Sequence, residues 1–152
     1  MDFKNLKTNK GNLIDGILLI KPKIFRDERG FFYESWNQVT FDKKIEPTIF
    51  CQDNHSKSEK GVLRGIHYQL SPYAQGKLVR CTKGKIFDIA IDLRKESNTY
   101  KEWIGVELND LNKYLLWIPE GFGHGFLTLC KDTEVQYKVT KKWHKEFEKS
   151  LL

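Results

Sequence analysis

What this sequence lacks excludes several common classes of protein. No run approaches the roughly 18 apolar residues of a membrane-spanning helix. The apolar run Ile17–Ile20 is framed by Asp15 and Lys21, and it is also too short for a signal peptide. Internal repeats and low-complexity segments are absent. We therefore expect a cytoplasmic protein without a membrane span.

Cysteine is scarce, and its spacing excludes two further classes. The three cysteines, Cys51, Cys81 and Cys130, are odd in number and far apart, and no CxxC pair occurs. Neither a zinc knuckle nor a disulfide framework fits this pattern. Reduced thiols, as in cytoplasmic proteins, are the better interpretation.

Several nucleotide-binding and catalytic motifs are missing. The sequence has no G-x-x-x-x-G-K-[ST] and no G-x-G-x-x-G, which argues against P-loop and Rossmann folds. It has no G-x-S-x-G, so a nucleophile elbow is not expected. A metal site needs three or four converging ligands. His67, His124 and a carboxylate could converge in principle, but no HxH or HExxH pair supports this, and we expect no metal.

The bulk composition indicates one folded domain spanning residues 1–152. Hydrophobic residues make up 39% and aromatic residues 13% of the 152, enough for a sizeable core without disulfide bonds. The formal net charge is +6 and the isoelectric point is about 9.1. That balance suits a nucleic acid, a membrane surface or a phosphorylated small molecule, and does not choose among them.

Short alternating segments predict an all-β fold. About nine or ten strands at close spacing favour an antiparallel sandwich or barrel, with short helical segments at residues 37–46 and in the tail after Trp143. The predicted strands include FFYESW (31–36), residues 77–82 and KIFDIAIDLRK (85–95). A hairpin turn at Lys83–Gly84 is expected to join the last two. In segment 85–95, apolar residues occupy one face, and Asp88, Ala90 and Asp92 occupy the other.

The stretch GVLRGIHYQLSPYAQGKLVR (61–80) concentrates chemistry on predicted strands. It contains Arg64, His67, Lys77 and Arg80, which suits an anionic ligand and a proton transfer. His67 is a candidate general base because imidazole titrates near neutral pH, although a structural histidine is about as probable from the residue alone. Lys77 could stabilise an oxyanion or be an ordinary solvated lysine.

Other candidates lie outside this stretch. Tyr137 alternates with Val135 and Val139 along a predicted strand. It could donate a phenolic proton or simply pack as an aromatic side chain. Arg29, with Arg64 and Arg80, could bind phosphate through guanidinium forks or form surface ion pairs. The segment QDNH (52–55) offers groups for a sugar or base edge, or for a turn. His124 lies in the glycine-rich PEGFGHGF and could touch a substrate.

Taken together, these segments resemble the dTDP-4-dehydrorhamnose 3,5-epimerases, a family of cupin-like sugar-nucleotide epimerases. The resemblance is carried by RDERGFFYESWN, QDNHSKSEKGVLRGIHYQ, AQGKLVR, FDIAIDLRKES, LWIPEGFGHGF and QYKVT, and extends from about residue 16 to 143. It implies a cupin-like antiparallel jelly-roll barrel. It also implies a homodimer in which N-terminal strands cross to the partner.

The resemblance further implies the reaction. The substrate would be dTDP-4-dehydro-6-deoxy-D-glucose, whose keto group acidifies the protons on C3 and C5. Inversion at both carbons through an enolate would give dTDP-4-dehydro-L-rhamnose, on the route to dTDP-L-rhamnose and polysaccharide, without metal or redox cofactor. His67 would be the base, Tyr137 the acid, and Lys77 the support of the enolate oxygen.

The resemblance also implies a set of substrate-binding positions. Trp143 stands where the family usually has a tyrosine that stacks on the thymine, and a larger ring can keep that stacking. The expected substrate-binding residues are Arg29, Glu34, Gln52, Asp53, Asn54, Arg64, His124, Trp143 and Glu148.

The sequence departs from the family's pattern at its end. Family members continue past the SLL position into a segment with an aspartate that pairs with the catalytic histidine and a lysine near the substrate. We expect this chain to lack both. Asp88 is the candidate substitute partner of His67, although a structural role for Asp88 is the better interpretation. A C3-only or C5-only epimerase and a silent sugar-nucleotide-binding cupin remain open. A nucleic-acid-binding module rests on the isoelectric point alone.

Overall fold

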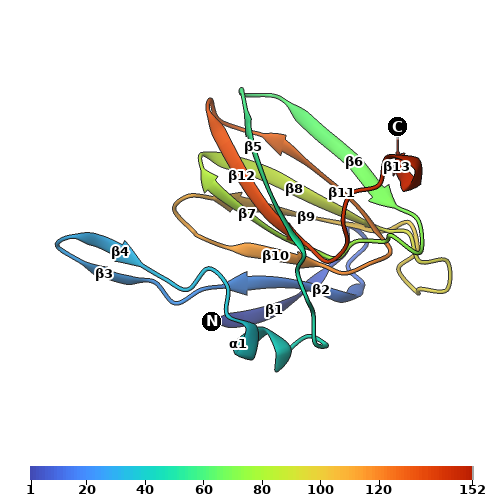
Figure 1. Cartoon of the computed structure of the whole chain (residues 1–152), viewed down its shortest axis with the longest axis horizontal. Helices are drawn as coiled ribbons and strands as arrows, with labels where there is room; N and C mark the ends of the chain where they lie inside the picture. The colour runs from blue at the N-terminus through green and yellow to red at the C-terminus, as the bar shows by residue number, and fades with distance from the viewer. Residues whose placement is uncertain (152) are drawn as a thin grey trace.

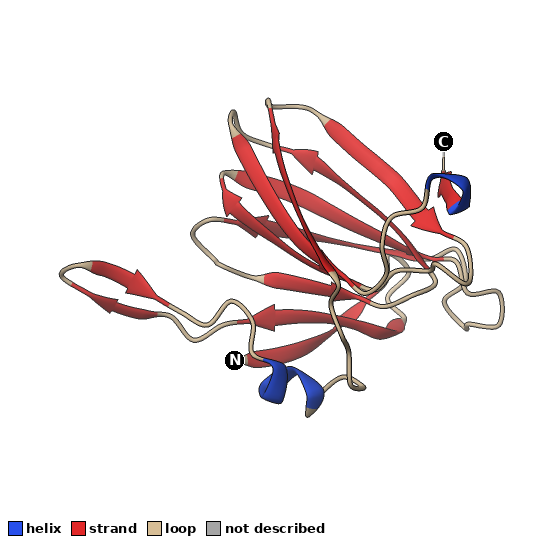
Figure 2. Cartoon of the chain, viewed as in Figure 1, coloured by secondary structure: helices blue, strands red, loops and turns tan. Residues whose placement is uncertain are grey.

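The structure is a computed structural model that describes residues 1–151. In that range the chain forms thirteen strands, one short α-helix and one 3-10 turn, and Figures 1 and 2 show that strands dominate it. Every strand pair is antiparallel. The all-β prediction with short helical segments is therefore confirmed.

Two sheets make up the body of the protein. The larger sheet has the strand order β1-β2-β10-β7-β12-β5, and the smaller has the order β13-β6-β11-β8-β9. The strands of the larger sheet are β1 (Asp2–Lys7), β2 (Leu13–Lys21), β10 (Leu115–Ile118), β7 (Lys77–Lys83), β12 (Thr133–Val139) and β5 (Gln52–Ser58). Those of the smaller sheet are β13 (Glu148–Ser150), β6 (Leu63–Gln69), β11 (Phe122–Thr128), β8 (Lys85–Asp92) and β9 (Trp103–Asn109).

The main core lies between the two sheets. Val79 and Val135 from the larger sheet, and Ile86 and Leu108 from the smaller one, are completely buried there. Apolar residues that alternate along facing strands form this layer because successive side chains point to opposite sides of a strand. The remaining space between the sheets is available for a polar cavity.

A second apolar cluster covers part of the outer face of the larger sheet. The helix α1 (Gln38–Asp42) begins at Asn37, whose side-chain oxygen accepts a hydrogen bond from the backbone N–H of Thr40 at 3.1 Å. This cap satisfies one free donor of the first turn. The helix buries Phe41, whose ring meets Trp117 edge to face with centroids 5.3 Å apart. The short helix predicted at 37–46 is confirmed.

The prediction of a hairpin at Lys83–Gly84 is wrong. The flanking strands β7 and β8 belong to different sheets, so the turn carries the chain from one sheet to the other. Gly84 has a φ of 78°, a left-handed conformation that glycine adopts without steric cost. Its N–H donates to the carboxylate of Asp110 at 2.8 Å. The local turn signal was correct, but it does not specify which strands pair.

The strand β8 buries the face that carries its aspartates. Asp88, Ala90 and Asp92 are completely buried, whereas the apolar row beginning at Phe87 is only half-buried. Both carboxylates have partners, as buried charge requires. Asp92, for example, accepts hydrogen bonds from Arg94, Ser97 and Thr99.

A two-stranded hairpin projects from the body (Figure 1). Its strands are β3 (Phe25–Asp27) and β4 (Gly30–Phe32), so the strand predicted through Trp36 ends earlier, at Phe32. Phe25, Phe31 and Phe32 are each more than half exposed. Such a row of exposed aromatic rings is typical of a surface that meets a partner.

The tail contains both a turn of helix and a strand. A 3-10 turn covers Lys145–Phe147, in partial agreement with the helical prediction, and β13 follows. This strand pairs with β6, with Ser150 opposite His67 and Glu148 opposite Gln69. The end of the described chain therefore lies beside the candidate catalytic histidine.

Candidate active site

A polar cavity of about 780 Å³ opens between the two sheets. Its size falls within the range of small-molecule sites. Six strands contribute to it, namely β5, β7 and β12 from the larger sheet and β6, β11 and β13 from the smaller one. The lining residues are Gln52, Asn54, His55, Ser56, Leu63, Arg64, Gly65, His67, Gln75, Lys77, His124, Phe126, Tyr137, Trp143 and Glu148. We refer to it as the central cavity.

His67 reaches the central cavity from β6. Its position depends on a close approach of β6 and β11, which pair His67 with His124 and then shift register before Phe126. A Cβ atom on Gly65 would lie 2.6 Å from the Cα of Gly125. Only glycine allows this approach, which sets the two histidines opposite each other.

Polar groups on β13 lie at one ring nitrogen of His67. The Ser150 hydroxyl oxygen is 3.0 Å from Nδ1, and a carboxylate oxygen of Glu148 is 3.8 Å from the same atom. The side chain of His67 remains 45% exposed. The other ring nitrogen, Nε2, is therefore the one available for proton transfer with a ligand.

Tyr137 reaches the cavity from β12 in the opposite sheet. Its neighbours in the same row, Val135 and Val139, are completely buried, as the predicted alternation requires. Burial raises the pKa of the Tyr137 phenol above its usual value, while a hydrogen bond from Asn54 and the charge of Arg64 act in the other direction. The phenol therefore keeps its proton at neutral pH, the state that a general acid needs.

The amide of Asn54 is itself oriented by a neighbour. Gln52 donates from Nε2 to the side-chain oxygen of Asn54 at 2.8 Å. This bond leaves the Asn54 amide N–H groups available to Tyr137 and to a ligand. Arg64 is held by a bond from its Nε to the Ser58 hydroxyl at 2.9 Å and by a longer one from Nη2 to the backbone oxygen of Lys57 at 3.4 Å. Nη1 and the second N–H of Nη2 remain available to an anion.

Lys77 is 9% exposed at the floor of the cavity. Burial lowers the pKa of its ammonium group from 10.5 to about 8, against the opposing charges of Asp88 and Glu148. Below that pH the group is a desolvated cation, which stabilises a developing oxyanion far more than a solvated one does.

The pKa of Lys77 predicts the alkaline limb of activity. Since the ammonium is charged below about pH 8, we expect kcat/KM to fall as pH rises through that value. Lys77→Met removes the charge and should lower kcat about 10²–10³-fold at neutral pH while abolishing the limb. Initial rates between pH 6 and 9.5 test this. A wild-type profile that stays flat to pH 9.5 would contradict it.

His124 forms a buried pair with Asp88. Its Nε2 lies 2.6 Å from a carboxylate oxygen of Asp88, and the two side chains are 5% and 0% exposed. The expectation that Asp88 pairs with His67 is therefore wrong. Asp88 points into the core from β8, where His124 on the adjacent strand β11 is within reach.

Four of the candidate residues lie away from the central cavity. Asp53 points to the outer face of the larger sheet, where it bonds Lys138 at 3.0 Å. Arg80 lies on that face as well and donates to Gln136 at 2.7 Å. Arg29, at the end of the hairpin, forms an exposed ion pair with Asp27 at 2.6 Å. Glu34 follows the same hairpin and is not among the lining residues.

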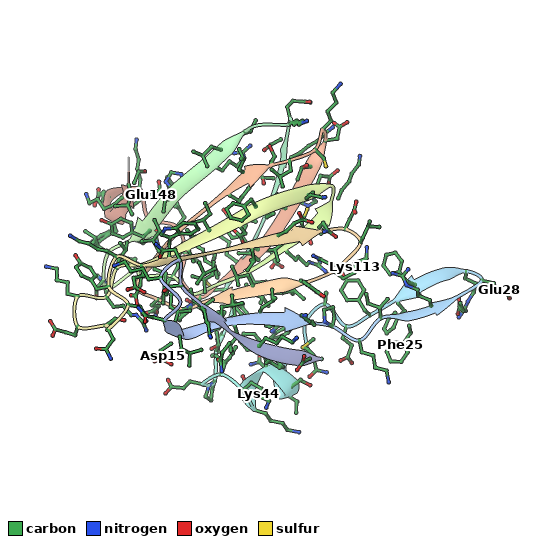
Figure 3. The ribbon with its side chains drawn as sticks, turned by 180° about the vertical axis from the view of Figure 1, so that it is seen from behind. Asp15, Phe25, Glu28, Lys44, Lys113 and Glu148 are labelled. Atoms are coloured by element: carbon green, nitrogen blue, oxygen red, sulfur yellow. The ribbon has the colours of Figure 1, made fainter. Side chains whose placement is uncertain are left out.

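The position of the hairpin explains why Arg29 is remote. In Figure 3, Glu28 at the hairpin tip and Glu148 beside the cavity lie at opposite ends of the molecule. Arg29 is adjacent to Glu28 in the sequence. It therefore cannot contact a ligand in the cavity of its own chain.

The sequence did not identify several lining residues. Gln75 and Phe126 each stand two residues from a predicted site residue, and that proximity was the available signal. Ser150 lies outside this lining but bonds His67, and the tail carries no motif that predicts its place. Within residues 1–151, no three metal-ligating side chains are grouped closely enough to hold an ion. No helix in this range is long and apolar enough to cross a membrane.

Comparison with known proteins places the chain in one family. Residues 12–152 match the family described as dTDP-4-dehydrorhamnose 3,5-epimerase. The enzyme of that name from Shigella flexneri is 54% identical over 140 residues, which cover 91% of this chain and 77% of the relative.

Solved structures of similar proteins extend this finding. A dTDP-4-dehydrorhamnose 3,5-epimerase from Bacillus anthracis with bound TDP and PPi superposes with a TM-score of 0.90 at 39% identity, covering 99% of this chain and 85% of that one. A 3,5-epimerase from Legionella pneumophila, in complex with dTDP-4-keto-L-rhamnose, also gives 0.90, at 44% identity and with 99% and 78% coverage.

Proposed function

The chain belongs to the dTDP-4-dehydrorhamnose 3,5-epimerase family, and on that premise we propose that its central cavity inverts C3 and C5 of dTDP-4-dehydro-6-deoxy-D-glucose. It is an isomerase with a cupin-like fold. The observation that carries the proposal is the placement of His67 and Tyr137 on opposite sheets of one cavity. Inversion at carbon requires a base on one face and an acid on the other.

The proposed reaction at each carbon has two steps. Nε2 of His67 takes the proton next to the C4 keto group, and the electron pair of the broken C–H bond moves into an enolate. The ammonium of Lys77 stabilises the enolate oxygen. Tyr137 then delivers its phenolic proton to the opposite face of the same carbon, which restores the ketone with inverted configuration.

The remaining cavity residues suit the rest of a nucleotide sugar. Arg64 offers guanidinium nitrogens that can bind diphosphate oxygens bidentately. Gln52 and Asn54 offer amide groups, and His124 and Glu148 complete the polar wall. Trp143 is 52% exposed at the cavity, so its ring is free to stack on the thymine.

We extend the proposal to a homodimer in which the hairpin β3–β4 reaches the partner's cavity. Arg29 and Glu34 would then contact the substrate of the partner, not of their own chain. The projecting hairpin and its exposed rings Phe25, Phe31 and Phe32 support this arrangement. A symmetric dimer would repeat the exchange twice.

Mixed dimers test the exchange of hairpins. We expect Arg29→Ala and His67→Ala to be weakly active or inactive alone, and an equal co-refolded mixture to regain about a quarter of wild-type activity. In a symmetric dimer, half the dimers would be mixed, each with one intact site. Rates of the separate and mixed variants are the measurement.

The control for this experiment mixes two variants that each damage the cavity of their own chain. A mixture of His67→Ala with Tyr137→Phe leaves every cavity with one defect, so no activity should return. Recovery in this control, or its absence in the Arg29 mixture, would contradict hairpin exchange.

The function itself is tested in heavy water. We expect the wild-type protein to place deuterium at both C3 and C5 of the dTDP-4-keto sugar and to form the L-configured product, as read by NMR. Deuterium at one carbon alone would indicate a single-carbon epimerase. Binding without exchange would indicate a silent sugar-nucleotide cupin.

A cytoplasmic location, where nucleotide sugars are made, fits the three free cysteines.

A further inference from the structure

The strand β13 places an unassigned hydroxyl at the candidate base. Ser150 lies directly opposite His67 in the β13–β6 pair, and directly opposite residues of antiparallel strands point to the same face. Its Oγ is 3.0 Å from Nδ1 of His67. The contact thus follows from strand register, which holds it in place even though Ser150 is exposed and His67 is partly exposed.

A second group on the same strand fixes the direction of this hydrogen bond. Glu148 stands two residues earlier, on the same face, and its carboxylate oxygen is 3.8 Å from Nδ1. A carboxylate accepts hydrogen bonds and favours positive charge near it. The carboxylate of Glu148 therefore favours the arrangement in which Nδ1 carries the proton and the Ser150 oxygen accepts from it.

The direction of this bond decides which nitrogen can act as a base. A neutral imidazole has one protonated nitrogen and one with a free electron pair. The hydrogen bond made by the first sets the tautomer. With the proton on Nδ1, the electron pair of His67 lies on Nε2.

We propose that Ser150 is a positioning residue that holds His67 in the Nδ1–H tautomer, with Glu148 stabilising the imidazolium formed when Nε2 takes a proton. The inference rests on the proposed function only for its catalytic consequence. The tautomer itself is a property of the free protein. Asp88, the other carboxylate considered for this task, is bonded to His124.

Three variants separate positioning from a merely structural role. Ser150→Ala removes the acceptor, and Ser150→Thr restores a hydroxyl at the same atom. Lys149→Ala alters the adjacent residue, which is exposed, lies opposite Tyr68 and points to the other face of β13. It therefore serves as the matched control for disturbance of the strand.

The first readout is the ring nitrogen NMR spectrum of the free protein. The sequence has four histidines, and the signals that disappear in His67→Ala identify those of His67. We expect wild type, Ser150→Thr and Lys149→Ala to show the Nδ1–H tautomer at His67, and Ser150→Ala to shift population toward Nε2–H. An unchanged tautomer in Ser150→Ala would overturn the proposal, whether or not the protein is an epimerase.

The second readout is steady-state kinetics with the dTDP-4-keto sugar. For Ser150→Ala we expect kcat to fall about 10- to 100-fold, part of the 10²–10⁴ that general acid–base catalysis supplies, with KM nearly unchanged. Ser150→Thr should recover most of the loss. Equal kcat in wild type and Ser150→Ala would overturn the positioning role and leave the proposed function intact. Lack of wild-type activity would contradict the proposed function, while the spectrum would still decide the tautomer.

Discussion

The His67→Ala variant is expected to lose epimerisation and to stop solvent deuterium from entering C3 and C5. General acid–base catalysis supplies about 10²–10⁴ in rate, equivalent to about 3–5 kcal/mol of transition-state stabilisation. Lys77, which is charged below about pH 8, and Tyr137, which keeps its proton, cannot replace the imidazole as the base. Deuterium incorporation by NMR and product formation are the measurements.

The loss must be catalytic and not a loss of the fold. The side chain of His67 is 45% exposed, so its truncation leaves little void in the core, and exposed substitutions usually change stability by less than about 0.5 kcal/mol. Tyr68→Phe is the matched control, because Tyr68 is the next residue on β6 and points to the other face. We expect wild-type exchange in the control and equal unfolding midpoints in all three proteins. Undiminished exchange in His67→Ala would sink the base assignment.

The Tyr137→Phe variant should separate exchange from inversion. His67 can still remove a proton and, after solvent exchange, return a deuteron to the same face of the carbon. We therefore expect slow deuterium entry with retained configuration, and a fall of about 10²–10⁴ in the rate of inversion. The affinity for dTDP, measured by calorimetry, should change little because only the phenolic oxygen is removed.

A second tyrosine provides the control for this variant. Tyr114 is partly buried against the main core and is not among the residues lining the cavity. Tyr114→Phe removes the same atom and should leave both inversion and binding near wild type. A parallel loss of inversion and dTDP affinity in Tyr137→Phe would show that the phenol binds substrate instead of protonating it.

The sequence alone determined the identity of the chemistry-bearing residues and much of the local structure. Alternation of Val135, Tyr137 and Val139 predicted that all three share one face, and the structure places the two valines in the core and the tyrosine at the cavity. The pattern of residues 37–46 sufficed to predict a short helix, which the structure places at Gln38–Asp42. These features depend on contacts between residues close in the chain, which a sequence pattern records directly.

Tertiary structure decided which of those residues meet. The period of two in β8 defines two faces but not which of them is buried. The face with the aspartates is buried because His124 binds Asp88 and Arg94 binds Asp92. The residues Lys83–Gly84 predict a turn equally well whether the flanking strands pair with each other or belong to different sheets. Each choice depends on partners distant in the sequence.

The partner of His67 shows the same limit most clearly. The polar face of its predicted strand made Asp88 a candidate partner of His67, yet the structure joins Asp88 to His124. It is the register of β13 against β6, set across more than 80 residues, that brings Ser150 and Glu148 to the imidazole. Residue types and the family resemblance pointed to a base, an acid and a cation. Strand pairing between distant segments determined which groups lie beside the proposed base.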